Sequence, residues 1–180
     1  YNESWGLPHL DTDLASRQWL ADLGAHVRAL DSTRLVVDND GWEHVESDMF
    51  GLHSYASDRP ALEADLRAAR EGGLLSGGRP FMVDESPPAA DKPLLLTEFG
   101  GIGFRTAPDQ EGWSYDDIPT SAEDFKRRFR ELFATVDEDE RLAGFVYTQL
   151  TDVESEINGL ATPDRVPKFD PQWIASVVAG

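Results

Sequence analysis

Two glutamates, Glu3 and Glu98, follow apolar or aromatic residues and stand beside small ones, where a buried strand would end in a loop. Glu3 lies in Tyr-Asn-Glu-Ser-Trp-Gly at 1–6, and Glu98 lies in Leu-Leu-Leu-Thr-Glu-Phe-Gly-Gly at 94–101. Because they are 98 − 3 = 95 positions apart, they would have to come from different strands of one sheet. Retaining glycosidases use such a pair, one as acid/base and one as nucleophile, roughly 5 to 5.5 Å apart. The pair therefore indicates glycoside hydrolysis.

The composition limits the partners this chain can have. With 180 residues, 40% of them hydrophobic, it can form about one domain, which we take as 1–180. Its formal charge is 16 − 34 = −18, and no segment clusters basic residues with aromatic ones. Nucleic acid and anionic membranes are therefore poor partners, and acidity of this kind more often serves solubility.

Several other signals are absent from the sequence. The lack of cysteine excludes disulfides and thiolate metal sites but leaves the cellular compartment unknown. No apolar run approaches the roughly 20 residues of a membrane span. Since the chain opens directly on Tyr-Asn-Glu with no strand before it, we expect it to be the later part of a longer protein.

Helix and strand signals alternate along the chain. Apolar spacing and capping residues predict helices over about 12–30, from Pro60 onward, from a Thr120/Glu123 capping box through 136, and over 171–178. Short apolar runs predict strands over 35–38, 49–55, 94–98 and 143–150. Between Glu71 and Lys92, glycine and proline dominate, which indicates a long irregular connection.

This alternation predicts the α/β class. Strands that are apolar on both faces, each followed by a helix, imply a parallel sheet covered by helices. Doubly wound nucleotide-binding folds and (β/α)8 barrels share this pattern. No G-x-G-x-x-G opens a helix, whereas acidic, amide and aromatic residues follow successive strands, as the active sites of barrels require. We therefore predict part of a (β/α)8 TIM barrel.

Five motifs together resemble glycoside hydrolase family 2, which includes β-galactosidases, β-glucuronidases and β-mannosidases. They occur in the family's order at 1–6, 38–42, 53–55, 97–101 and 147–160. The resemblance covers nearly the whole chain. It implies the C-terminal portion of the catalytic TIM barrel, from the end of strand 4 through helix 8. The rest of the barrel and upstream β-sandwich domains would then belong to the full-length protein, and the fragment alone would be inactive.

The resemblance also implies roles for individual residues. Glu3 would be the acid/base, with its pKa held up by a nearby carboxylate, and Glu98 would be the nucleophile at the end of strand 7. Asn2 would hydrogen-bond the sugar 2-hydroxyl, a contact that strengthens in the transition state. The Tyr55 hydroxyl would orient the nucleophile, although a half-buried strand tyrosine is the alternative.

Further residues are candidates for binding the sugar. Trp42, Trp113 and Tyr115 offer aromatic faces for stacking, with packing as an equal alternative, and His53 belongs to the His-Ser-Tyr motif. Gln149 and Asn158, with the carboxylates between them, follow the last strand, where hydroxyl-binding groups belong, although for any single one of them a solvated loop residue is the favoured alternative. The glycine-bearing loop 99–119 is a candidate lid. Several family members carry tryptophan at the end of strand 8, where this chain has Gln149-Leu150, so the sugar is not identified.

Other chemistries do not fit the sequence. A calcium loop centred on Gly41 would place Val36 and Ser47 where Asp and Glu belong, and the histidines lack H-E-x-x-H spacing. Ser76 lacks a nucleophile elbow, and there is no P-loop. We therefore predict no metal and no cofactor, and a retaining glycosidase that cleaves β-glycosidic bonds by double displacement. The alternative is a non-catalytic carbohydrate-binding or interaction module derived from such a barrel.

Overall fold

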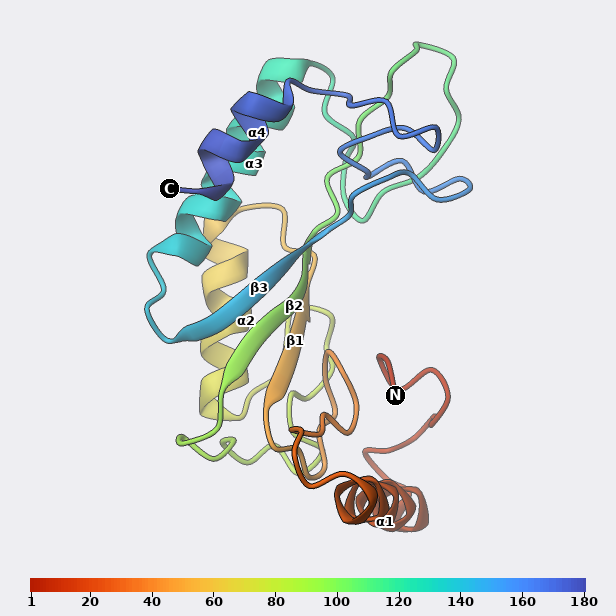
Figure 1. Cartoon of the computed structure of the whole chain (residues 1–180), viewed down its shortest axis with the longest axis vertical. Coiled ribbons are helices and arrows are strands. Elements are labelled where there is room, and N and C mark those ends of the chain that lie inside the picture. Colours follow the sequence, from red (N-terminus) through yellow and green to blue (C-terminus); the bar gives the residue numbers. More distant parts are fainter. The chain divides into compact units, whose positions relative to one another are not determined.

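The computed structural model describes residues 1–180 and is an α/β structure with four helices and three strands. Along the chain these are α1 (Leu14–Leu30), β1 (Phe50–Ser54), α2 (Arg59–Glu71), β2 (Leu94–Gly100), α3 (Ala122–Asp137), β3 (Leu142–Thr148) and α4 (Pro171–Val178). The strands form one parallel sheet in the order β1-β2-β3 (Figure 1). The α/β class and the parallel sheet are confirmed, and the eight-stranded barrel stays a prediction.

The predicted strand over 35–38 is wrong. No strand is assigned there, and Leu35 is 62% exposed. Side chains, and not a neighbouring strand, accept the backbone hydrogen bonds of this segment. Val36 N donates to Asp48 Oδ2 at 2.8 Å, and Asp38 N donates to Ser47 Oγ at 2.9 Å. Parallel backbone pairing begins only after this apolar run, where isolated β-bridges join Asn2 to Asp40 and Gly41 to Leu52.

The four predicted helices are confirmed, with one cap displaced. Asp13 caps α1 and Asp170 caps α4, which has Pro171 in its first turn. The cap of α3 is Ser121 instead of Thr120, because the helix begins one residue later than predicted, at Ala122. The Ser121 hydroxyl accepts a hydrogen bond from Asp124 N at 3.2 Å. The irregular connection after α2 is also confirmed, since no helix or strand is assigned between Glu71 and Leu94.

The chain divides into two compact units. The first comprises Tyr1–Ser54, Glu63–Thr97 and Arg141–Phe145, and the second comprises Tyr55–Leu62, Glu98–Glu140 and Val146–Gly180. None of the helices combines the length and the hydrophobicity needed to cross a lipid bilayer.

In the first unit, β1 is buried along its whole length and positions the loop before it. The His44 ring packs edge-on against Phe50 and Phe81, with centroids 5.1 and 4.9 Å away. Its Nδ1 lies 2.8 Å from Asp38 Oδ1. Burial raises the pKa of Asp38, but hydrogen bonds from His44 and Ser47 outweigh burial and hold that pKa far below its usual range. This buried network fixes the loop that carries Asp40 and Trp42.

In the second unit, the apolar face of α3 forms the core. Phe125, Phe129 and Phe133 are buried, and Tyr147 from β3 contacts the last two. Helix α4 lies beside α3 (Figure 1), with Trp173 against Phe129. This aromatic core holds the ends of β2 and β3, from which the candidate site residues of this unit come.

A buried ion pair fixes the loop after β3. Lys168 Nζ lies 2.7 Å from Asp152 Oδ1 and also donates to the carbonyls of Phe104 and Ile157. Burial lowers the pKa of Lys168, while Asp152 opposes that shift. With its donors satisfied inside the protein, this lysine acts as a structural anchor.

Candidate active site

The segment that carries Glu3 runs beside residues 38–40. Asp40 N donates to Tyr1 O at 2.9 Å and Glu3 N donates to Asp40 O at 2.8 Å, the pattern of two neighbouring parallel strand ends. Glu3 and Ser4 then take left-handed conformations, with φ of 56° and 59°. Such a conformation costs about 1 to 3 kcal/mol per residue, and it persists where the surroundings fix it, often at functional sites. Asn39 does so here, since its side chain bonds both Ser4 N and Ser4 Oγ.

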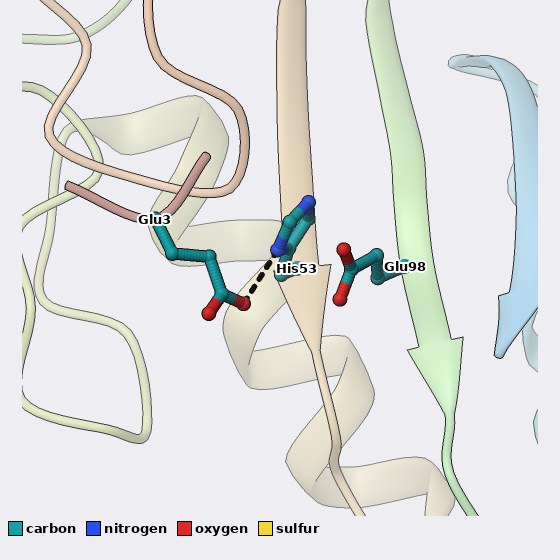
Figure 2. A group of neighbouring side chains, drawn as sticks. All are labelled: Glu3, His53 and Glu98. Carbon is teal, nitrogen blue, oxygen red and sulfur yellow. Dashed lines mark hydrogen bonds and ion pairs between the residues drawn. The ribbon is translucent and has the colours of Figure 1, made fainter. Parts of the chain in front are cut away.

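The carboxylate of Glu3 accepts two hydrogen bonds. His53 Nδ1, from β1, lies 2.6 Å from Oε1 (Figure 2). Trp5 Nε1 donates to Oε2 at 2.7 Å. Burial raises the pKa of Glu3, but the hydrogen bonds from His53 and Trp5 outweigh burial, so that the pKa lies below its ordinary value. Glu3 is therefore held as an ionised acceptor.

This direction differs from the sequence prediction, in which a neighbouring carboxylate holds the pKa of Glu3 up. The reason is that the two donors, His53 and Trp5, favour the charged form. An ionised Glu3 suits the base role in the second step of a retaining mechanism. An acid role in the first step would require that Glu3 take up a proton as it engages a substrate.

Asp40 lies on the other side of His53. Its Oδ2 is 3.6 Å from His53 Nε2, and its Oδ1 accepts from Thr97 Oγ1 at 2.7 Å. Two glycines make room for this arrangement. A Cβ at Gly51 would lie 1.7 Å from Asp40 Oδ1, and one at Gly41, where φ is 103°, would lie 2.8 Å from His53 Nδ1. The fully buried imidazole is therefore fixed between two carboxylates.

In the second unit, Glu98 from β2 is paired with Tyr55. The Tyr55 hydroxyl donates to Glu98 Oε2 at 2.5 Å. Burial raises the pKa of Tyr55 far above its ordinary value, and the hydrogen bond to Glu98 raises it further. Tyr55 thus stays a neutral donor, and the Glu98 carboxylate is the acceptor.

Aromatic side chains of the loop after β2 surround this pair. Tyr115 stacks on Tyr55 with ring centroids 3.4 Å apart and planes at 2°, and Trp113 meets Tyr115 edge-on at 5.3 Å. A Cβ at Gly101 would lie 2.6 Å from both tyrosine rings, so the close stack depends on that glycine. Trp113 is 47% exposed and lines an open groove with Arg105 and Arg128, which does not include Glu98.

The remaining predicted residues fall into distinct settings. Gln149 Nε2 donates to Asn158 Oδ1 at 2.6 Å, and Asn158 Nδ2 donates to Glu156 Oε1 at 2.9 Å, so the structure brings this pair together. Asn158 is fully buried. In the first unit Trp42 is half-buried, with its ring edge-on to His53 at 6.0 Å, and Asn2 is exposed.

Sequence reasoning missed Trp5 and Asp40. Each lies within two residues of a predicted site residue, Trp5 after Glu3 and Asp40 before Trp42. Asp40 contacts His53 and Thr97, which lie 13 and 57 positions away in the sequence, and Trp5 reaches Glu3 through a tight turn. A local sequence pattern predicts neither kind of contact. The left-handed turn at Glu3 and Ser4 is what brings Trp5 back onto the carboxylate.

Comparisons with known proteins support the fold. No protein-family model matches the chain, and no curated protein matches it. Solved structures do match. A GH2 β-galacturonidase from Eisenbergiella tayi, bound to galacturonate, has a TM-score of 0.65 and 14% identity over 95% of this chain. β-Glucuronidases from an uncultured Clostridium sp. and from Ruminococcus gnavus have TM-scores of 0.61 and 0.60, with 20% and 18% identity over 98% of this chain.

At these identities the likeness concerns the fold. The resemblance to glycoside hydrolase family 2 is confirmed at that level. The chain spans 31% of the galacturonidase, 30% of the Clostridium glucuronidase and 31% of the R. gnavus enzyme. Any activity of the whole protein is therefore a matter of proposal.

Proposed function

We propose that this chain carries the catalytic carboxylates of a retaining β-glycosidase, with Glu98 as nucleophile and Glu3 as acid/base. The observation that carries the proposal is the 2.5 Å hydrogen bond from the Tyr55 hydroxyl to Glu98. A neutral phenol that donates to a carboxylate stabilises its charged form and fixes the orientation of the group, and both suit a carboxylate that attacks an electrophilic carbon.

The reaction follows in two displacements. In the first, a Glu98 oxygen bonds to the anomeric carbon as the bond to the leaving oxygen breaks, and Glu3 gives its proton to that oxygen. In the second, Glu3 removes a proton from water, the water oxygen bonds to the anomeric carbon, and the ester to Glu98 breaks. Each displacement inverts the anomeric carbon, so the product keeps the configuration of the substrate.

His53 and Trp5 act on Glu3 throughout this cycle. Their donors stabilise the carboxylate that forms when Glu3 has given up its proton. In the second step the same ionised oxygens are the base. We also propose that Asn2, Trp42, Trp113 and Gln149 bind the sugar, with the buried Asn158 orienting Gln149, within a (β/α)8 barrel completed by other parts of the protein.

The substrate class is a β-glycoside. The sequence resemblance makes β-galactosides, β-glucuronides and β-mannosides candidates, with β-galactosides first. The matched solved structures are of β-glucuronidases and a β-galacturonidase, which adds β-galacturonides. The test is to express the full reading frame that contains these residues and to measure release of nitrophenol from a panel of nitrophenyl glycosides. Turnover of at least one β-glycoside with β-configured product is expected. Sugar binding without turnover on the whole panel would favour the non-catalytic module instead.

A further inference from the structure

We propose that Trp5 and Arg79 form the wall of the leaving-group subsite, and that this subsite takes a neutral group with a flat face, either an aryl ring or a second sugar ring. The inference rests on the proposed function, because it takes Glu3 as the acid/base.

The position of Trp5 follows from its bond to Glu3. The acid/base gives its proton to the glycosidic oxygen, and the other substituent of that oxygen is the leaving group. Trp5 Nε1 lies 2.7 Å from Glu3 Oε2, so its indole stands one hydrogen bond from the oxygen that would handle this proton. A side chain there borders the leaving group.

The exposed ring of Trp5 lies beside the Glu3 carboxylate. It is 68% exposed, which leaves most of a large apolar ring open at a place where chemistry would occur. Tryptophan rings bind flat apolar faces well and keep a polar N–H for orientation. An exposed aromatic ring at this place can therefore contact the leaving group.

The ring is nonetheless held in place by three contacts. These are the bond to Glu3, an edge contact with Trp42 at 6.3 Å and 86°, and the guanidinium of Arg79, whose Cζ lies 5.6 Å from the Trp5 ring centroid. A surface ordered before the ligand arrives loses less entropy on binding.

Arg79 is itself fixed and neutralised. Its Nη1 lies 3.2 Å from Oε1 of Glu43, whose side chain is 4% exposed, and its Cζ is 5.9 Å from the Trp42 ring. Glu43 has φ of 54°, a left-handed conformation held by its N–H bond to the Pro80 carbonyl. Because Arg79 and Glu43 cancel in charge, the wall offers no net charge to a charged leaving group, and a neutral flat one fits it.

The test uses the full-length enzyme with one sugar, chosen by the nitrophenyl panel, and two leaving groups that need little protonation. A dinitrophenyl glycoside has a flat aryl face, whereas a glycosyl fluoride has none. For Trp5→Ala we expect kcat/KM to fall about tenfold on the dinitrophenyl glycoside and less than about threefold on the fluoride. Trp5→Phe keeps a ring but loses the N–H, so it should keep the wild-type ratio of the two substrates.

Trp19→Ala is the matched control, since Trp19 is a 46% exposed tryptophan whose ring contact is with Tyr1. It should leave both values of kcat/KM unchanged.

If the wild-type enzyme hydrolyses both substrates and Trp5→Ala lowers both equally, Trp5 acts only by orienting Glu3 and the subsite assignment is wrong. If the wild-type enzyme hydrolyses neither substrate and no panel member, the proposed function fails, and the inference fails with it. Trp5→Gln keeps the experiment decisive should Trp5→Ala not fold, because it keeps a side-chain N–H but has no aromatic face. It should lower kcat/KM on the dinitrophenyl glycoside more than on the fluoride, and an equal effect on both would overturn the subsite assignment.

Discussion

At the scale of single residues, the two glutamates sit in different donor sets. Glu3 accepts from an imidazole and an indole, and Glu98 accepts from a phenol. Their types and their places at strand ends were predictable from the sequence. The hydrogen-bond partners of these glutamates were only partly predictable, because Trp5 reaches Glu3 through a left-handed turn that residue types do not reveal.

The first prediction concerns the acid/base. Glu3→Ala in the full-length enzyme should slow substrates with poor leaving groups by about 10² to 10⁴-fold, because their glycosidic oxygen needs a proton. Substrates with activated leaving groups should be cleaved in the first step at nearly the wild-type rate. Pre-steady-state release of alkyl and dinitrophenyl leaving groups measures both effects. Equal losses on the two kinds of substrate would reverse the roles assigned to Glu3 and Glu98.

At the scale of elements, the sequence predicted the helices and strands that are marked by a periodic or continuous pattern of apolar residues. The repeating phenylalanines of α3 and the short apolar runs of β1 and β2 mark buried faces, and these elements form where expected, as does β3. The run at 35–38 has the same apolar character, but Asp48 and Ser47 bind its backbone in place of a strand partner. Side-chain competition for backbone donors is a tertiary effect that a local pattern cannot report.

Strand β1 supports the candidate site through Gly51. Gly51→Ala would place a Cβ 1.7 Å from Asp40 Oδ1, so Asp40 must move away from Thr97 and His53. We expect a loss of about 1 to 3 kcal/mol in the free energy of unfolding and reduced turnover in the full-length enzyme. Gly77→Ala is the control, since its Cβ would meet no atom within 4 Å, and it should change stability by less than about 0.5 kcal/mol. Urea denaturation compares the two, and equal effects would mean that Asp40 is not fixed by close packing.

At the scale of the whole molecule, this 180-residue chain leaves much apolar surface in water. Strand β3 has Phe145 40% and Val146 58% exposed, although its sequence is apolar on both faces. On α1, Leu23, Val27 and Leu30 are between 37% and 77% exposed. An edge strand with exposed apolar side chains is open to pairing with another chain. A net charge of −18 opposes that association without covering the surface.

We therefore expect residues 1–180, produced alone, to aggregate or dimerise and to lack measurable glycosidase activity. Light scattering after size exclusion measures the first, and the nitrophenyl panel measures the second. Ion-exchange behaviour should still reflect the strong negative charge. A cooperatively melting monomer that hydrolyses a β-glycoside would show that these residues need no further strands to form a working site.

The measurement that tests the central claim most directly is the anomeric configuration of the product formed by Glu98→Ala in the presence of azide. Without its nucleophile the full-length enzyme should be inactive on a β-glycoside, and azide should restore turnover by direct attack on the anomeric carbon. Proton NMR should then show the inverted α-glycosyl azide, whereas Glu3→Ala with azide should give the retained β-glycosyl azide. A β-glycosyl azide from Glu98→Ala would contradict the assignment, because it would require a nucleophile other than Glu98.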